Sequence, residues 1–302
     1  MNKRIFLQTG LALALLFGFS VGADAADKLK AVASFSILGD MVSQVGGDRV
    51  EVVTLVGPDG DAHVYEPTPA DAKNLAGAAI LFVNGLGFEG WMDRLEKSSG
   101  FKGKVVVAST GVKARTMVEE EGGKPETITD PHAWQSLANG KLYVGNIRDG
   151  LIAADPDGKS VYEANAAKYL GEIMQEDDAV KAALATLSKE RRKIITSHDA
   201  FGYFGAAYGL EVIAPEGVST ESEASAQDVA KIIRQIKAEK IPAVFMENIT
   251  DHRLLDQIAS ETNAKIGGTL YTDALSGADG PAGTYLDMFR HNVGTLTAAL
   301  SS

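Results

Sequence analysis

The chain has 302 residues, with 29 Lys and Arg, 40 Asp and Glu, five His and no Cys. The absence of Cys excludes disulfides, thiolate zinc sites, iron–sulfur clusters and catalytic or lipid-modified cysteines. A formal net charge of −11 argues against nucleic-acid binding, because phosphates require a basic surface, and the length predicts about two domains.

Residues 1–25 have the pattern of a secretory signal peptide. Lys3 and Arg4 precede an apolar stretch over 11–19, and small residues lead to an A-x-A site that closes at Ala25. An N-terminal membrane anchor is the alternative, but it requires about 20 apolar residues. We therefore expect a periplasmic protein that is secreted through a cleavable signal and, because it has no Cys, is not a lipoprotein.

Strands and helices alternate over residues 26–157, which we interpret as a first α/β lobe. The hydrophobic pattern predicts strands at 29–34, 50–56, 79–84 and 104–109, and helices at 37–45, 69–76 and 89–97. Strands that are apolar throughout and alternate with helices indicate a parallel sheet covered on both faces.

A long helix is expected next, over residues 158–191. From 160 to 192 the only glycine is Gly171 and there is no proline, while Ala, Glu, Lys and Leu are abundant. A linker of this composition should be stiff. We therefore expect a rigid helix between two lobes, with a ligand site in the interlobe cleft at the carboxyl ends of the strands.

The strand–helix pattern restarts over residues 192–302, which we interpret as a second, similar α/β lobe. Predicted strands are 193–197, 211–214, 243–247 and 265–271, and predicted helices are 200–208, 227–240, 251–262 and 284–299. The sequence thus predicts two similar lobes, each with a central parallel-type sheet flanked by helices.

Three of the five histidines lie in loops or just beyond predicted strands, in phrases rich in Asp, Pro and Gly. These are His63, His132 and His198, and Asp273 follows a strand of the second lobe in a matching place. Three neutral imidazoles and one carboxylate make a ligand set suited to Zn²⁺. Because their spacing is far from any local metal motif, a hydrogen-bonded structural role for each histidine is the alternative.

Other polar and aromatic residues are weaker candidates. Glu247 ends a predicted strand at the cleft, where it would either orient a ligand imidazole or make a plain buried hydrogen bond. His252 is interpreted as a surface cap of a helix and His291 as structural. Trp91 and Trp134 are expected in the core or at the lobe interface. A glycine motif for nucleotide phosphates is missing from the sequence.

Four phrases resemble the ligand motifs of the zinc- and manganese-binding solute-binding proteins of bacterial metal ABC transporters (cluster A-I, solute-binding protein family 9). They are Asp61-Ala62-His63-Val64-Tyr65-Glu66-Pro67, Asp130-Pro131-His132-Ala133-Trp134, His198-Asp199-Ala200-Phe201-Gly202-Tyr203-Phe204 and Tyr271-Thr272-Asp273-Ala274-Leu275. The resemblance covers essentially the whole chain after the signal segment. It implies that His63 and His132 from the first lobe, and His198 and Asp273 from the second, hold the metal between them. It also implies delivery to a membrane permease driven by a cytoplasmic ATPase.

Zn²⁺ is the favoured transported ligand, and Mn²⁺ is the alternative. Manganese-specific relatives often carry Glu where this chain has His198, and nitrogen ligands suit zinc whereas oxygen ligands suit manganese. Zinc-binding members often carry a His-rich loop before the second ligand. Residues 117–126 instead contain carboxylates and no His, and we interpret them as a solvated acidic turn.

We therefore expect a monomeric periplasmic protein that captures a divalent transition metal and is not an enzyme. Its partner would be the permease of a metal ABC importer, with a periplasmic metallochaperone as a second candidate partner. One alternative is a periplasmic zinc hydrolase with three His, a water and Asp273 as general base. The sequence disfavours it because the helix motif HExxH is missing. The other alternative is an adhesin or interaction protein whose partner binding does not require these four residues.

Overall fold

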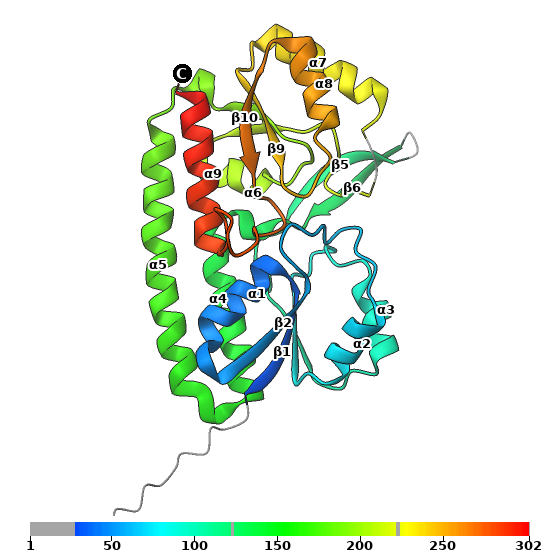
Figure 1. Cartoon of the computed structure of the whole chain (residues 1–302). Coiled ribbons are helices and arrows are strands. Elements are labelled where there is room, and N and C mark those ends of the chain that lie inside the picture. The colour runs from blue at the N-terminus through cyan, green and yellow to red at the C-terminus, as the bar shows by residue number, and fades with distance from the viewer. Residues whose placement is uncertain (1–27, 122–123, 222–223, 302) are drawn as a thin grey trace, which may run out of the picture.

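The computed structural model describes residues 28–301, apart from 122–123 and 222–223. The predicted signal peptide lies outside the described residues. Two parallel sheets, one from each half of the chain, lie beside a pair of long helices (Figure 1). Within the described part of the chain, no helix combines the length and the apolar character that a membrane crossing requires.

The first sheet has the strand order β2-β1-β3-β4, with every neighbouring pair parallel. Its elements are β1 (Leu29–Phe35), β2 (Val50–Val56), β3 (Ile80–Val83), β4 (Lys104–Val107), α1 (Ser36–Gly46), 3-10 helix η1 (Gly47–Arg49), α2 (Pro69–Ala76) and α3 (Met92–Ser99). Residues 31–35 of β1 are all buried. A strand buried on both faces is what the continuous apolar run predicts.

The second sheet repeats this topology with the order β10-β9-β7-β8, again all parallel. Its elements are β7 (Lys193–Ile195), β8 (Glu211–Ile213), β9 (Ala243–Glu247), β10 (Lys265–Leu270), α6 (Gly202–Tyr208), α7 (Ala226–Glu239), α8 (Arg253–Thr262) and α9 (Tyr285–Leu300). In both sheets the first strand lies between the second and the third. The strand order therefore reverses direction at the first strand. In parallel sheets, ligands usually bind at the carboxyl ends of the strands on either side of such a reversal.

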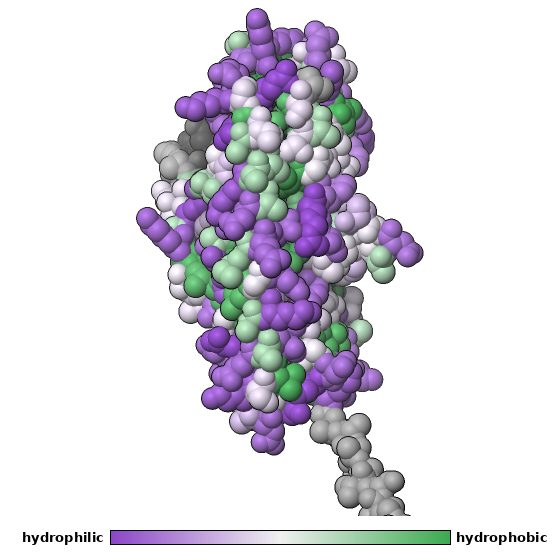
Figure 2. Space-filling view, turned by 90° about the vertical axis from the view of Figure 1, so that its left-hand side faces the viewer, coloured by the Kyte–Doolittle hydropathy of each residue, from purple (hydrophilic) through white to green (hydrophobic). Residues whose placement is uncertain are grey.

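The long helix α5 spans Lys159–Ala185, within the predicted linking segment 158–191. At 27 residues it is about 40 Å long, and it packs against α1, α4 and α9. Figure 2 shows the face of the molecule on the side of α5, where hydrophilic residues are interspersed with scattered hydrophobic ones. The α/β class, the parallel sheets and the long helix are therefore confirmed, whereas the division of the chain at residues 157 and 191 stays a prediction.

Helix α4 (Leu137–Ala154) was missed by the sequence pattern. Glycines at 140, 145 and 150 weaken its intrinsic helix propensity. Two of them allow close packing, since an added Cβ would lie 2.7 Å from the Tyr285 hydroxyl oxygen at Gly140 and 2.8 Å from a Val106 methyl carbon at Gly150. Tertiary packing therefore overrides the local propensity. 3-10 helices η3 (Pro156–Gly158) and η4 (Lys189–Arg191) lie on either side of α5.

The interpretation of residues 117–126 as an acidic turn was wrong. Most of them belong to an antiparallel hairpin, β5 (Arg115–Glu121) and β6 (Lys124–Asp130), in which Met117 pairs with Ile128. β-branched residues favour this structure, since Thr116 and Val118 lie in β5 and Thr127, Ile128 and Thr129 lie in β6. The many charged residues of this segment concealed its strand-forming residues.

One large hydrophobic cluster runs through the first sheet, α4, α5, α9 and part of the second lobe, and a smaller one lies under α7 and α8. Ile173 of α5 is fully buried in the large cluster, whereas Met174 next to it is 52% exposed. The chain therefore offers a matched pair of residues on one helix.

Ile173→Ala should lower the free energy of unfolding by about 2–5 kcal/mol, because it leaves a cavity among helices that cannot fully close it. Met174→Ala should change it by less than about 0.5 kcal/mol. Urea unfolding followed by circular dichroism measures both. Equal effects would contradict the packing described for α5.

Candidate metal centre

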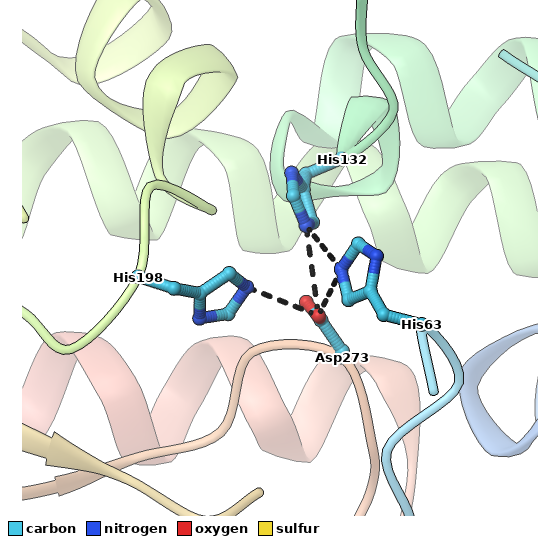
Figure 3. A group of neighbouring side chains, drawn as sticks. All are labelled: His63, His132, His198 and Asp273. Atoms are coloured by element: carbon cyan, nitrogen blue, oxygen red, sulfur yellow. Dashed lines mark hydrogen bonds and ion pairs between the residues drawn. The ribbon is translucent and has the colours of Figure 1, made fainter. Parts of the chain in front are cut away.

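The four residues singled out from the sequence meet between the lobes. His63 lies in the loop after β2, and His132 lies between β6 and the 3-10 helix η2 (Ala133–Gln135). His198 follows β7, and Asp273 follows β10. One nitrogen or oxygen atom from each residue lies within 4.8 Å of those from the other three, and the side chains point toward one another (Figure 3).

The carboxylate of Asp273 is the centre of this cluster. Its Oδ2 atom lies 3.1 Å from the Nε2 atoms of His63 and His198, and 3.5 Å from Nε2 of His132. The Nε2 atoms of His63 and His132 are 3.2 Å apart. The second oxygen of Asp273, Oδ1, is buried and has no hydrogen-bond partner among the described residues. An unpaired buried carboxylate oxygen is costly, and it leaves a free ligand atom directed at the cluster.

Two further carboxylates orient the imidazoles from outside. Asp130 Oδ1 lies 3.0 Å from Nδ1 of His132, and Glu247 Oε2 hydrogen-bonds Nδ1 of His198. Glu247 also accepts the backbone N–H of His198 through Oε1. When Nδ1–H donates to a carboxylate, the lone pair of Nε2 faces the centre of the cluster. Glu247 therefore orients the His198 imidazole through a buried hydrogen bond, and its predicted role beside a metal ligand stays a prediction. The contact of Asp130 with His132 was missed, although Asp130 lies two residues before it.

Two tryptophans hold the segments that carry the clustered residues, and one of them, Trp134, joins the two lobes. Trp134 donates from Nε1 to the Thr272 carbonyl at 2.9 Å, so the segment after His132 is tied to the residue before Asp273. Trp91 donates from Nε1 to the Ala62 carbonyl at 2.8 Å, next to His63. Both tryptophans are buried, which confirms their predicted places in the core and at the lobe interface.

The two remaining histidines lie outside the cluster. His291 contacts the Thr269 carbonyl at 3.0 Å through Nε2, so its predicted structural role is confirmed. His252 precedes α8 but makes no side-chain capping bond, and its Nε2 instead lies 3.2 Å from the Glu247 carbonyl. The predicted capping role is therefore wrong.

Burial and mutual charge set the protonation of the cluster. Burial by itself lowers the pKa of an imidazole, but the charge of Asp273 and the hydrogen bond with Asp130 outweigh it and raise the pKa of His132 to about 9. The charges of Glu247 and Asp273 likewise outweigh burial and raise the pKa of His198 well above its usual value. For His63, burial prevails and lowers the pKa.

Asp273 responds in the opposite direction. Burial raises the pKa of a carboxylic acid, but the charges of His132 and His198 outweigh it and lower the pKa of Asp273 well below its usual range. Without a bound cation, these pKa shifts favour an ionised Asp273 beside protonated His132 and His198. A divalent cation can replace those protons, because it supplies the same positive charge to the same atoms.

Comparison with known proteins adds the family context. Residues 31–299 match the family described as zinc-uptake complex component A, periplasmic. The manganese-binding lipoprotein MntA of Halalkalibacterium halodurans is 34% identical over 90% of this chain and 89% of its own length. The iron-binding protein YfeA of Yersinia pestis is 32% identical over 91% of this chain and 87% of its own. The structure of the periplasmic zinc-binding protein TroA of Treponema pallidum superposes with a TM-score of 0.83 at 31% identity, covering 90% of this chain and 99% of that one.

These names correct one prediction and limit another. Relatives such as MntA are named lipoproteins, which overturns the prediction of a protein that is not a lipoprotein. That prediction drew on the absence of Cys alone. The names also differ in the metal, since manganese, iron and zinc each appear. A divalent metal ligand is common to them.

The pKa of His132 leads to a pH prediction for the metal-free protein. Its folded-state pKa of about 9 exceeds the unfolded value of about 6.5, so its contribution to stability is complete below pH 6.5 and is lost as the pH rises toward 9. The raised pKa of His198 acts in the same direction. Chelator-treated protein should therefore lose resistance to urea between pH 6.5 and 9, and His132→Gln should lose less. Constant or rising stability over this interval would contradict these charge states.

Proposed function

The chain belongs to the family of the periplasmic zinc-uptake component A, and we propose that zinc is the metal that it captures and passes to a membrane permease. Members of this family are metal-binding, substrate-binding components of ABC transporters and not enzymes. The hydrolase alternative is thereby excluded. A monomeric state and loading by a metallochaperone stay predictions.

We propose His63, His132, His198 and Asp273 as the metal ligands. The observation that carries this assignment is the convergence of three Nε2 atoms on Asp273, whose Oδ1 atom has no partner among the described residues. In a tetrahedron with metal–ligand bonds of about 2.0–2.1 Å, the ligand atoms lie about 3.3–3.4 Å apart. The Nε2 and Oδ2 atoms that contact each other are 3.1–3.5 Å apart, close to that spacing.

The chemistry of the ligand set favours zinc over manganese and iron. Three of the four side chains offer imidazole nitrogen, and a single carboxylate supplies oxygen. Affinity of nitrogen ligands for divalent metals rises from Mn²⁺ through Fe²⁺ to Zn²⁺, whereas Mn²⁺ is suited to carboxylate-rich sites. If both oxygens of Asp273 bind, the cation has five protein ligand atoms, which favours capture and transport over the activation of a water.

Alanine substitutions test the assignment. His63→Ala and His198→Ala should each weaken zinc binding about 100-fold or more, because a lost ligand matters at least as much as a lost orienting group. Chelator competition monitored with a fluorescent zinc indicator measures these affinities.

His252→Ala is the matched control, since His252 is exposed and lies outside the cluster. It should bind zinc as the wild type does. Wild-type affinity in both His63→Ala and His198→Ala would refute the ligand assignment, while leaving membership of the transporter family intact.

Metal preference requires a separate measurement. When the chelator-treated protein is dialysed against equal concentrations of Zn²⁺ and Mn²⁺, one zinc per chain should be retained, because imidazole nitrogen prefers zinc. Elemental analysis by mass spectrometry gives the ratio. Manganese in the larger amount would contradict the proposal and favour the manganese alternative.

A further inference from the structure

The four clustered residues differ in their access to solvent. The side chains of His132, His198 and Asp273 are completely buried, whereas that of His63 is 5% exposed. His63 also lines a cavity of about 830 Å³ at the surface, together with Phe88 from the first lobe and Val218 from the second. A cation that enters through this cavity therefore reaches His63 before the other three clustered side chains.

His63 is positioned by the carboxylate of Asp61. Asp61 Oδ1 accepts the backbone N–H of His63 at 2.9 Å. Its other oxygen, Oδ2, accepts the hydroxyl of Thr220 at 2.6 Å, across the interface between the lobes. One carboxylate therefore connects the backbone of His63 to a side chain of the second lobe.

The Thr220 hydroxyl belongs to a loop, residues 214–221, that is attached to the segment carrying His198. The Glu216 N–H donates to the Ser197 carbonyl at 3.2 Å, and the Asp199 N–H donates to the Gly217 carbonyl at 2.9 Å. Hydrogen bonds and the backbone of this loop thus connect the neighbours of His198, through Thr220 and Asp61, to the backbone of His63. This connection crosses beside the cavity and contains none of the four clustered side chains.

We propose that the hydrogen bond from Thr220 to Asp61 is a latch that controls how fast the metal enters and leaves. This inference rests on the proposed metal ligands, and it assigns to Thr220 a positioning role without direct metal contact. While the bond is intact, loop 214–221 and the His63 loop stay closed against each other. When it breaks, His63 can move toward the cavity and expose the cation.

Other bonds keep the His63 loop in place when the latch opens. The Asp59 N–H donates to the Leu275 carbonyl at 2.9 Å, and Asn248 Nδ2 donates to Asp59 Oδ1 at 3.0 Å. Both bonds cross between the lobes, and neither involves Thr220. Loss of the Thr220 hydroxyl should therefore loosen the loop locally and leave the fold and the ligand set unchanged.

The latch predicts a kinetic signature. A hydrogen bond to an ionised carboxylate stabilises the closed state enough that its loss should raise the open population about tenfold. Since metal passes through the open state in both directions, the rates of association and release should rise together, with a smaller change in the dissociation constant. A residue that only stabilised the bound metal would change the release rate alone.

Stopped-flow release of Zn²⁺ into excess chelator, and Zn²⁺ association with chelator-treated protein, test this account. Thr220→Val keeps the β-branched shape and removes the hydroxyl, so both rates should rise about tenfold. Thr220→Ser keeps a hydroxyl, so its rates of zinc association and release should stay close to those of the wild type. Thr186→Val is the control, because it removes a threonine hydroxyl at the exposed C-terminal end of α5, outside loop 214–221, and it should exchange at wild-type rates.

A double-mutant cycle isolates the pair. Asp61→Ala should accelerate exchange, and adding Thr220→Val to it should produce no further acceleration. Wild-type rates in Thr220→Val, or faster release without faster association, would overturn the latch. The number of zinc ions bound per wild-type chain separates the two proposals. A wild-type chain that binds no zinc refutes the proposed function. A wild-type chain that binds zinc, combined with unchanged exchange rates in Thr220→Val, refutes only the latch.

Discussion

The buried carboxylate of Asp273 is the constraint on which the site depends. A lone negative charge in the interior is strongly unfavourable, so the surrounding structure must supply positive charge. Three imidazoles face it, and Asp130 and Glu247 hold two of them from outside. Without a cation, the raised pKa values of His132 and His198 favour protonated imidazoles beside this carboxylate. A divalent metal would supply the same compensation, as our proposal of a metal centre at these residues requires.

The fold places these groups by repeating one topology. Each sheet has its first strand between the second and third, and the loops beyond the carboxyl ends meet between the lobes. His198, Glu247 and Asp273 lie at or just beyond the ends of β7, β9 and β10, which are neighbours in the second sheet. Trp134 ties the two sides together through the Thr272 carbonyl. The lobes therefore meet through bonds that do not require the metal.

Much of this arrangement could be predicted from local pattern. Apolar runs identified the strands of both sheets, and strands followed by polar loops indicated where His63, His198 and Asp273 would meet, although their role as ligands stays a proposal. Helix α4 was missed because its glycines serve packing against Tyr285 and Val106, which only the tertiary structure reveals. The hairpin β5–β6 was concealed by its charge, and the orienting contact of Asp130 depends on side-chain geometry that residue type alone does not specify.

The central claim is that one divalent cation lies among the three imidazoles and Asp273. Anomalous diffraction from a crystal of the zinc-loaded protein, recorded on both sides of the zinc absorption edge, tests it most directly. The account predicts a single strong peak within bonding distance of the Nε2 atoms of His63, His132 and His198 and of the Asp273 carboxylate. A peak elsewhere would contradict it, and so would a zinc ion to which one or more of these four side chains is not bound.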